Sequence, residues 1–423
     1  MQNINLSAGR HEETIWDVVV IGGGASGMMS AGTAGSLGKK VLLLEKNETL
    51  GKKLLITGGG RCNVTNAEND LRVLLSKFKD SDKFLFSAFT QFSNKDTLEF
   101  FNSRGMETKI EALGRVFPIT NKAQTVWDVL LNYLKDNKVT ISSNSEVSKI
   151  NTEDGKVVSV TLKNKKEIKA KSFILATGGM SRPETGSTGD GFKWLKDIGH
   201  NVVEPTASLV PIKTKTEWVT KLQGISVEDV KITLLQNNEK QSIKRGKILF
   251  THFGLSGPTI LNTSSEIAEL LKYGEVFLSL DLLPAFDHGQ LNQKLQDVIA
   301  ENSNKKYKNI LDNLLPSSIA NVVVEISKID PDKKSNSVTR EERLSLIELI
   351  KNLKVEVDCL LGEDKAIVTS GGVVLEEVDF KTMASKLFPN LYLIGDILNI
   401  NRPSGGYSLQ LCWTTGYVAG QTK

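Results

Sequence analysis

The chain has 423 residues, of which 39% are hydrophobic and 24% are charged. This composition is that of a globular protein and excludes an intrinsically disordered one, and the length predicts two or three domains. The formal net charge is only +4, and the basic residues are spread along the chain. We therefore expect no nucleic-acid partner, because proteins dedicated to nucleic acids concentrate their basic residues.

Cysteine usage and hydropathy bear on the cellular compartment. Three cysteines, Cys62, Cys359 and Cys412, are too few for a disulfide framework, which favours a reducing environment. No apolar run approaches the roughly 18–20 residues that span a bilayer. The polar N-terminal leader, residues 1–16, lacks the apolar core of a secretory signal. We therefore expect a cytoplasmic protein without a membrane partner.

The N-terminal residues after the leader predict a β-α-β unit. The apolar run at residues 17–21 predicts a strand, the small residues at 25–37 predict a helix, and the run at 41–44 predicts a second buried strand that ends at Glu45. Such a unit is typical of the start of a doubly wound parallel sheet.

The pattern of apolar residues and glycines changes twice along the remaining chain, and near the C-terminus it again resembles that of the β-α-β unit. The predicted elements are helices at 71–101 and 125–134, strands at 157–162 and 172–175, antiparallel strands at 231–235, 247–250 and 276–280, helices within 291–350, and strand-and-glycine segments at 366–374 and 391–396. The middle of the chain is therefore an expected insertion. The predicted domains are a first domain at 17–200 and 355–423, a β-rich insert at 201–287 that serves the substrate, and a helical subdomain at 288–354.

The first glycine cluster, residues 22–27, satisfies G-x-G-x-x-G between a predicted strand and a predicted helix. Gly22 permits the tight turn, Gly24 lets backbone N–H groups approach a pyrophosphate, and Gly27 lets the helix pack on the sheet. Glu45 would accept hydrogen bonds from an adenosine ribose and would favour NAD over NADP if the ligand were a nicotinamide dinucleotide. The alternative is a glycine-rich turn that binds nothing.

A second cluster, residues 57–63, has the sequence TGGGRCN. Three consecutive glycines suggest backbone that lies flat against a planar ring. Flavin disulfide reductases carry two cysteines with four residues between them at a comparable position, whereas Cys62 is followed at that spacing by Ala67, which excludes dithiol chemistry. Cys62 is either a reactive thiol or, as we favour, a small residue that fills space beside a cofactor.

Two further strand ends indicate FAD rather than NAD. Residues 174–179 end a strand in Ala-Thr-Gly-Gly, and residues 391–396 end another in Gly-Asp. FAD is long, so its ribityl chain and ring need contacts from the far C-terminal strand of the sheet, and Asp396 is placed to bind them. The helix expected after residues 404–410 would direct its N-terminal N–H groups at the flavin ring.

These residues together resemble a family of bacterial FAD-dependent oxidoreductases, the NAD(P)/FAD-dependent oxidoreductases that include aminoacetone oxidases and 3-dehydro-bile-acid Δ4,6-reductases. The matching strings are KLLITGGGRCNVTN, ATGGMSRPETGSTGDGF, FTHFGLSGPTIL, VTSGGVV and GGYSLQ. The resemblance implies an α/β fold with a Rossmann-like FAD-binding domain of the two-dinucleotide-binding type, interrupted by a β-barrel-like domain and a small helical subdomain. It also implies that FAD is bound non-covalently.

The chain departs from the family where the family often has Gly-Glu-x-x-Asp-x-Asp-Gly. The corresponding residues here include Asp396, Asn399, Asn401 and Arg402 followed by Pro403. Amides thus replace most of the acidic positions, and Pro403 stiffens the loop and removes one N–H donor.

The motifs and the resemblance give one set of predicted cofactor-binding residues, and no metal site. The predicted residues are Gly22, Gly24, Ala25, Ser26, Gly27, Glu45, Lys46, Lys53, Thr57, Gly58, Gly59, Gly60, Arg61, Cys62, Asn63, Val147, Ala176, Thr177, Gly178, Gly395, Asp396, Gly405, Gly406, Tyr407, Ser408 and Leu409.

The sequence offers one candidate catalytic residue. His252, in FTHFGLSGP, could donate a proton toward the flavin, although a loop histidine satisfied by backbone is the alternative that we favour. Lys52, Lys53 and Arg61 could attract the pyrophosphate or an anionic substrate, and Arg61, inside the glycine segment, is the best of the three.

The sequence therefore predicts an FAD-dependent oxidoreductase that exchanges a hydride between flavin N5 and a small organic substrate held between the FAD domain and the β-rich insert. Either NAD(P)H docks transiently as electron donor or O₂ reoxidises the flavin, and the sequence leaves both open. Two alternatives are a flavin-dependent RNA-modifying enzyme and a non-catalytic flavin-binding scaffold or sensor. Substrate identity and oligomeric state are not predicted.

Overall fold

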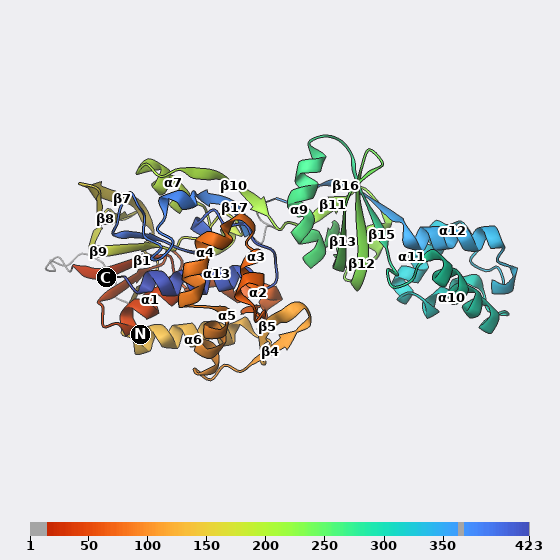
Figure 1. The fold of residues 1–423 in the computed structure, drawn as a ribbon, viewed down its shortest axis with the longest axis horizontal. Helices are drawn as coiled ribbons and strands as arrows, with labels where there is room; N and C mark the ends of the chain where they lie inside the picture. The colour runs from red at the N-terminus through yellow and green to blue at the C-terminus, as the bar shows by residue number, and fades with distance from the viewer. Residues whose placement is uncertain (1–14, 363–367, 423) are drawn as a thin grey trace. The chain divides into compact units, whose positions relative to one another are not determined.

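The computed structural model describes residues 15–362 and 368–422. The chain divides into two compact units. Unit 1 contains the residues up to Ser208 and those from residue 363 onward, and unit 2 is Leu209–Gly362. Figure 1 shows the elements of each unit.

The centre of unit 1 is a seven-stranded sheet with the strand order β6-β2-β1-β9-β8-β7, to which β18 adds by pairing with β9. The parallel strands are β1 (Trp16–Ile21), β2 (Val41–Leu44), β6 (Thr140–Ser142), the end of β9 (Glu167–Leu175) and β18 (Leu391–Leu393). β7 (Val147–Glu153) and β8 (Lys156–Leu162) pair antiparallel. Residues 18–21 of β1 and all of β2 are apolar and buried because both faces of a parallel sheet are covered.

Helices pack on this sheet and carry the first glycine loop. α1 (Ala25–Ser36) lies beside α13 (Tyr407–Gly420), and α6 (Ala123–Asp136) packs on α1 (Figure 1). The approach of α13 requires small residues, because a Cβ on Gly416 would lie 2.6 Å from the Ser26 carbonyl oxygen. The other helices of unit 1 are α2 (Lys52–Gly60), α3 (Leu71–Ser76), α4 (Asp82–Gln91), α5 (Asn94–Asn102) and α7 (Asp190–Asp197).

Two small sheets complete unit 1. β3 (Thr65–Asn66), β5 (Arg115–Pro118) and β4 (Thr108–Glu111) form a three-stranded antiparallel sheet. β10 (Val202–Ser208) pairs antiparallel with β17 (Val368–Val373). The predicted strand-and-glycine segment at 366–374 begins outside the described residues. Its described part forms β17, which pairs with the segment that leads into unit 2 rather than with the central sheet.

Unit 2 is a closed barrel with helices that share its hydrophobic core. The strands are β11 (Ile212–Thr214), β12 (Ser226–Gln236), β13 (Glu239–Phe250), β14 (Gly254–Ser256), β15 (Val276–Asp281) and β16 (Leu353–Leu360). The helices are α8 (Trp218–Lys221), α9 (Pro258–Leu271), α10 (His288–Glu301), α11 (Ser317–Ser327) and α12 (Arg340–Lys351). One cluster of buried side chains joins the barrel strands to α10, α11 and α12.

The architecture confirms the predicted fold class, and the boundaries differ at two places. Residues 201–208 belong to unit 1, where residues 202–208 form β10, rather than to the start of the insert. Residues 353–360 form β16, which closes the barrel by pairing with β11 and β15, so residues 355–362 belong to unit 2 and not to the first domain. α9 was missed within the β-rich insert, because its buried residues Ile260, Leu261 and Ile267 flank a polar stretch that hides the helical period.

Candidate functional site: a dinucleotide pocket

A pocket of about 870 Å³, part of it open to solvent, lies at the carboxyl ends of the parallel strands β1, β2 and β9. Gly22, Glu45 and Ala176 directly follow these three strands, and all three line the pocket. Ligands of doubly wound sheets bind at this edge, outside the carboxyl ends of the strands. Every residue in the lining of this pocket belongs to unit 1.

The structure divides the predicted cofactor-binding residues into two groups. Those that line the pocket are Gly22, Gly24, Ala25, Ser26, Glu45, Lys46, Lys53, Val147, Ala176, Thr177, Gly178 and Asp396. Those that lie outside its lining are Gly27, Thr57, Gly58, Gly59, Gly60, Arg61, Cys62, Asn63, Gly395, Gly405, Gly406, Tyr407, Ser408 and Leu409.

The first glycine loop forms a cradle at the N-terminus of α1. Gly22 has φ +106°, and a Cβ there would lie 2.5 Å from the Ala176 carbonyl oxygen, while a Cβ on Gly27 would lie 1.8 Å from the Gly22 carbonyl oxygen. A Cβ on Gly24 would meet nothing within 4 Å. No side chain caps α1 at Gly24, and an uncapped helix N-terminus favours an anion.

Glu45 is a buried carboxylate beside this cradle. Its Oε2 accepts a hydrogen bond from the Gly23 N–H at 2.8 Å, and its Oε1 accepts from the Asn47 N–H and from Asn47 Nδ2, each at 2.8 Å. The side chain therefore fixes the glycine loop, and its remaining lone pairs can still accept from ribose hydroxyls.

Thr177 adds a hydroxyl without a protein partner. Thr177 lines the pocket, and its buried Oγ1 has no hydrogen-bond partner among the described residues. An unsatisfied buried hydroxyl is costly, and a polar ligand in the pocket would satisfy it. The open cradle at Gly24, the carboxylate of Glu45 and this hydroxyl are thus complementary to the diphosphate and ribose of a dinucleotide such as FAD.

Asp396 lies within a buried charge cluster at another wall of the pocket. It is paired with Arg402, its Oδ2 lies 3.6 Å from Lys53 Nζ, and that Nζ donates to Ser181 Oγ at 2.7 Å. Burial raises the pKa of Asp396, but the charges of Arg402 and Lys53 outweigh it, and the net pKa lies below its ordinary value. Arg402, one of the departures from the family pattern, therefore keeps Asp396 ionised.

The TGGGRCN segment folds differently from a simple loop. It ends α2, where Gly58 and Gly59 have φ values of +57° and +68° that break the helix. Arg61 turns away from the pocket: it pairs with Glu111, donates to Asn121 Oδ1, and its guanidinium carbon lies 4.1 Å from the ring centre of Phe117. This residue thus ties the segment to β4 and β5 rather than attracting a pyrophosphate in this pocket.

Cys62 is fully buried in the hydrophobic core. Burial raises the pKa of its thiol to about 12, and a thiol with so high a pKa is a poor nucleophile. The structure therefore favours the space-filling interpretation of this residue.

The N-terminus of α13 lies against the three-stranded sheet. Gly406 has φ +99°, and a Cβ there would lie 2.3 Å from the Thr65 carbonyl oxygen. Tyr407, the first residue of α13, lines a second cavity with Asn66 and Glu68. Cys412, farther along α13, does line the dinucleotide pocket.

His252 belongs to unit 2, in the turn between β13 and β14, and its side chain is exposed. Its ring makes an edge contact with Phe253 at 4.9 Å between centres. Among residues 15–362 and 368–422, no three His, Cys, Asp or Glu side chains are grouped as metal ligands. No helix in the same described ranges is long and apolar enough to cross a membrane.

Several pocket residues were not predicted. They are Ile21, Leu44, Asn47, Gly51, Ser145, Glu146, Thr185, Gly186, Ser187, Thr188, Asp190, Trp194 and Cys412. The string ATGGMSRPETGSTGDGF contained Thr185 to Asp190 and was the available signal for that part of the wall. Ser145 and Glu146 reach the pocket because β6 pairs with β2, a long-range pairing that no local motif encodes.

The fold and the pocket define a dinucleotide-binding protein of the Rossmann type. The family model described as HI0933-like protein Rossmann domain matches residues 16–422. The chain therefore belongs to this FAD-binding Rossmann family, and its class is that of the flavin-dependent oxidoreductases. The resemblance seen in the sequence is confirmed.

Curated relatives match over nearly the full chain. The chain is 32% identical over 409 residues to the ribosomal RNA dihydrouridine synthase of Escherichia coli (strain K12), covering 96% of this chain and 97% of the relative. It is 31% identical over 407 residues to the 3-dehydro-bile acid delta(4,6)-reductase of Clostridium scindens, covering 95% of this chain and 97% of the relative.

Solved structures share the fold at low identity. A 3-ketosteroid delta1-dehydrogenase from Sterolibacterium denitrificans has a TM-score of 0.54 at 14% identity, with 96% of this chain and 98% of that chain covered. A flavocytochrome c3 fumarate reductase has a TM-score of 0.54 at 17% identity, with 96% of this chain and 78% of that chain covered. These similarities show the fold alone.

Proposed function

We propose that the protein is an FAD-dependent reductase that saturates a carbon–carbon double bond conjugated to a carbonyl group. The observation that carries the FAD part of the proposal is the open cradle at Gly24 beside the buried carboxylate of Glu45. FAD, when bound, supplies the hydride through N5 of its ring. Residues of the chain bind the cofactor, orient it and exclude water.

The reaction type is supported by what the names of the two relatives have in common. Dihydrouridine is uridine whose ring double bond, conjugated to a carbonyl, has gained two hydrogen atoms. A Δ4,6-reductase of a 3-dehydro bile acid reduces double bonds conjugated to the 3-oxo group. In both, one carbon receives a hydride and its neighbour a proton, so the substrate gains two electrons and two protons in all.

The physiological electron donor is the part of the cycle that the sequence leaves open. The chain has one dinucleotide fingerprint, at residues 22–27, and this is assigned to FAD. We propose that NADH or NADPH would dock transiently and would serve as the electron donor for FAD held by this fingerprint.

A second candidate is reduction of a uridine in ribosomal RNA, which is favoured by the names of the Escherichia coli relative and of a Haemophilus influenzae relative that is 29% identical over 404 residues. RNA-binding surfaces are generally basic. Unit 2, however, has as many acidic as basic residues. A small conjugated ketone is therefore the first substrate class to test.

The test is an anaerobic spectral titration of the purified protein. We expect flavin absorption bands that NADH or NADPH bleaches, and that return when a 4-ene-3-oxo steroid is added. Return of the bands only with unmodified ribosomal RNA, with uridine gaining two hydrogen atoms by mass spectrometry, would support the second candidate. Absence of flavin after incubation with FAD would overturn both, and reoxidation by air alone would favour an oxidase.

His252 stays a candidate proton donor, and the same assay tests it. If His252 donates the proton, His252→Ala keeps the FAD spectrum and the rate of bleaching but slows the return of the bands by about 10²–10⁴-fold. An unchanged return of the bands would assign His252 to the turn alone.

A further inference from the structure

One wall of the dinucleotide pocket is a segment without strand or α-helix, residues 178–189, which we call the strap. It runs from the end of β9 to the start of α7, and its Thr185, Gly186, Ser187 and Thr188 line the pocket. Left-handed backbone recurs along it, with φ +75° at Gly178, +60° at Arg182, +104° at Gly186 and +80° at Gly189.

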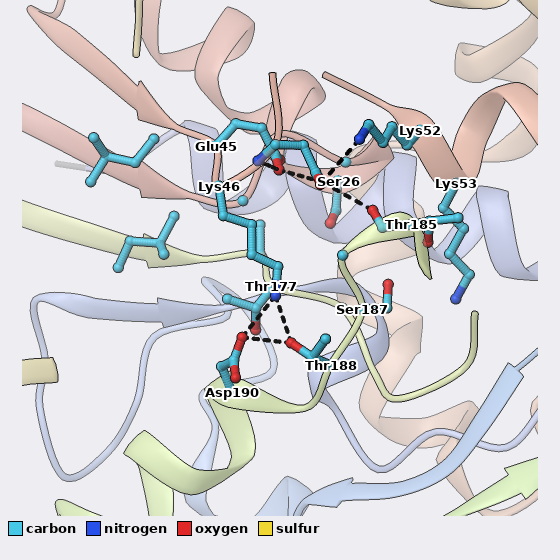
Figure 2. A pocket seen from close by; sticks show the side chains of 18 of the residues that line it. Ser26, Glu45, Lys46, Lys52, Lys53, Thr177, Thr185, Ser187, Thr188 and Asp190 are labelled. Carbon is cyan, nitrogen blue, oxygen red and sulfur yellow. Dashed lines mark hydrogen bonds and ion pairs between the residues drawn. The ribbon is translucent and has the colours of Figure 1, made fainter. Parts of the chain in front are cut away.

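Polar contacts tie the strap and the start of α7 to the opposite wall. Lys46 Nζ, from the end of β2, lies 2.8 Å from Asp190 Oδ2 and 2.5 Å from Thr188 Oγ1 (Figure 2). Asn47 Nδ2 donates to the Thr185 carbonyl oxygen at 3.1 Å. The third tie is the hydrogen bond from Lys53 to Ser181 described above.

The Lys46–Asp190 pair is the charged member of these contacts. Thr188 Oγ1 also lies 2.6 Å from Asp190 Oδ2, so the three side chains form a closed triangle. Burial raises the pKa of Asp190, but hydrogen bonds from Lys46 and Thr188 outweigh that effect and hold its pKa below the ordinary value. Asp190 is therefore ionised at neutral pH.

The ammonium group of Lys46 is occupied by its contacts with Thr188 and Asp190. A lysine directly after Glu45 could contact the ribose or the phosphates of a dinucleotide itself, but here its ammonium group is directed at the strap side of the pocket (Figure 2). The side chains of Lys46 and Asp190 are 24% and 40% exposed, so solvent and salt can compete for the pair.

We propose that the strap is a closure over the cofactor pocket and that the Lys46–Asp190 pair is the latch that sets the rate at which FAD leaves. The proposal rests on the proposed function only in that FAD occupies the pocket. Breaking the latch frees the strap to move at its left-handed residues, and because an exposed or half-exposed ion pair is weak, the expected change in release rate is about two- to fivefold.

The test measures release of radiolabelled FAD from the holoprotein during a chase with unlabelled FAD. We expect Lys46→Met and Asp190→Asn to speed release by about the same factor, and the double variant to be no faster than either, because both remove one interaction. Lys171→Met breaks a comparable ion pair to Asp17, at 2.7 Å, away from the pocket, and should leave the release rate unchanged.

The variants separate a latch from direct binding of FAD by Lys46. If Lys46 binds FAD directly, Asp190→Asn leaves release unchanged or slows it, and that result would overturn the proposal. Thr188→Val, which keeps both charges, provides a milder opening of the triangle if either charge variant fails to fold. Wild-type protein that retains no labelled FAD would overturn the cofactor assignment itself, whereas retention with identical rates in all variants would overturn only the latch.

Discussion

Three glycines of the first loop are required for three different reasons. Gly22 needs a left-handed backbone against Ala176, Gly27 needs the absence of a Cβ so that α1 can approach the sheet, and Gly24 has no close neighbour at all. Gly24 also has φ −79°, which any residue adopts. The first two glycines therefore serve the fold, and Gly24 serves the pocket.

This difference predicts opposite results for two substitutions. Gly24→Val should leave the free energy of unfolding of the apoprotein nearly unchanged but fill the cradle, so that the protein is purified without flavin. Gly27→Ala should lower the free energy of unfolding by about 1–3 kcal/mol, because its Cβ would overlap the Gly22 carbonyl oxygen. Denaturant unfolding of the apoproteins and the flavin absorbance of the purified proteins measure the two effects.

A yellow Gly24→Val protein with full FAD content would contradict the placement of the diphosphate at this loop. Gly24→Val and Gly27→Ala are a matched pair because both lie within residues 22–27 and both add only apolar atoms.

The cysteines differ in reactivity for a reason that only the folded structure supplies. Burial raises the pKa values of Cys62 and Cys412 to about 12, whereas Cys359 is exposed on β16. We expect iodoacetamide at neutral pH to modify Cys359 alone in the native protein and all three cysteines in denaturant, as counted by mass spectrometry. Rapid modification of native Cys62 would restore the reactive-thiol interpretation.

At the scale of elements, a buried histidine joins the end of α7 to the segment that precedes β18. His200 Nδ1 lies 2.6 Å from Glu377 Oε2, and its Nε2 lies 2.9 Å from Ser385 Oγ. Because Ser385 Oγ already accepts from two backbone N–H groups, of Leu387 and Phe388, its proton goes to Nε2, and Nδ1 donates to Glu377. The hydrogen-bond chain from Ser385 through His200 to Glu377 resembles the catalytic triad of a hydrolase. Because Ser385 is buried, these contacts stabilise the fold.

The cluster predicts a pH-dependent contribution to stability. Burial raises the pKa of Glu377, whereas hydrogen bonds from His200 and Asn201 lower it. The hydrogen bonds outweigh burial, so the net pKa lies below the ordinary value. A carboxyl with a depressed folded-state pKa stabilises the protein above its unfolded pKa of about 4.3 and loses this contribution as pH falls through the folded value.

Glu377→Gln should therefore lower the free energy of unfolding by about 1–3 kcal/mol at pH 7, and the difference from wild type should shrink below about pH 4. Denaturant unfolding across pH measures it. Glu376→Gln, at the exposed neighbouring position, is the control and should follow wild type. A difference that stayed constant into acid would show that ionisation of Glu377 contributes nothing.

Local sequence patterns predicted the helices and strands whose own residues show an apolar run or a glycine motif. The strand at 41–44 and the start of the helix at Ala25 follow from buried β-branched and leucine runs and from the glycine loop. α9 and β16 were not predicted in place, because one is masked by a polar stretch and the other is defined by its barrel partners. The sequence motif ATGGMSRPETGSTGDGF contains the strap. Its contacts with Lys46 and Asn47 depend on side-chain positions in the folded structure, which residue spacing in the sequence does not predict.

At the scale of the whole molecule, the chain enters and leaves unit 2 at adjacent points. Ser208, the last residue of β10, pairs with Val368, the first residue of β17, and paired antiparallel residues lie about 4.5–5.5 Å apart. The pocket lining belongs to unit 1, while unit 2 has a separate hydrophobic core in its barrel and helices. Cofactor binding and the contribution of unit 2 are thus separable by deletion.

Replacing residues 209–367 with a short Gly-Ser linker should give a folded unit 1 that still binds FAD, because no lining residue of the pocket is removed and a turn of two to five residues spans such a strand pair. We expect its flavin to be bleached by chemical reductant but its turnover of conjugated ketones to fall to background, since the predicted role of the insert is to bind the substrate. Full turnover by the shortened protein would place the whole reaction in unit 1, whereas a folded but colourless protein would show that FAD binding needs unit 2.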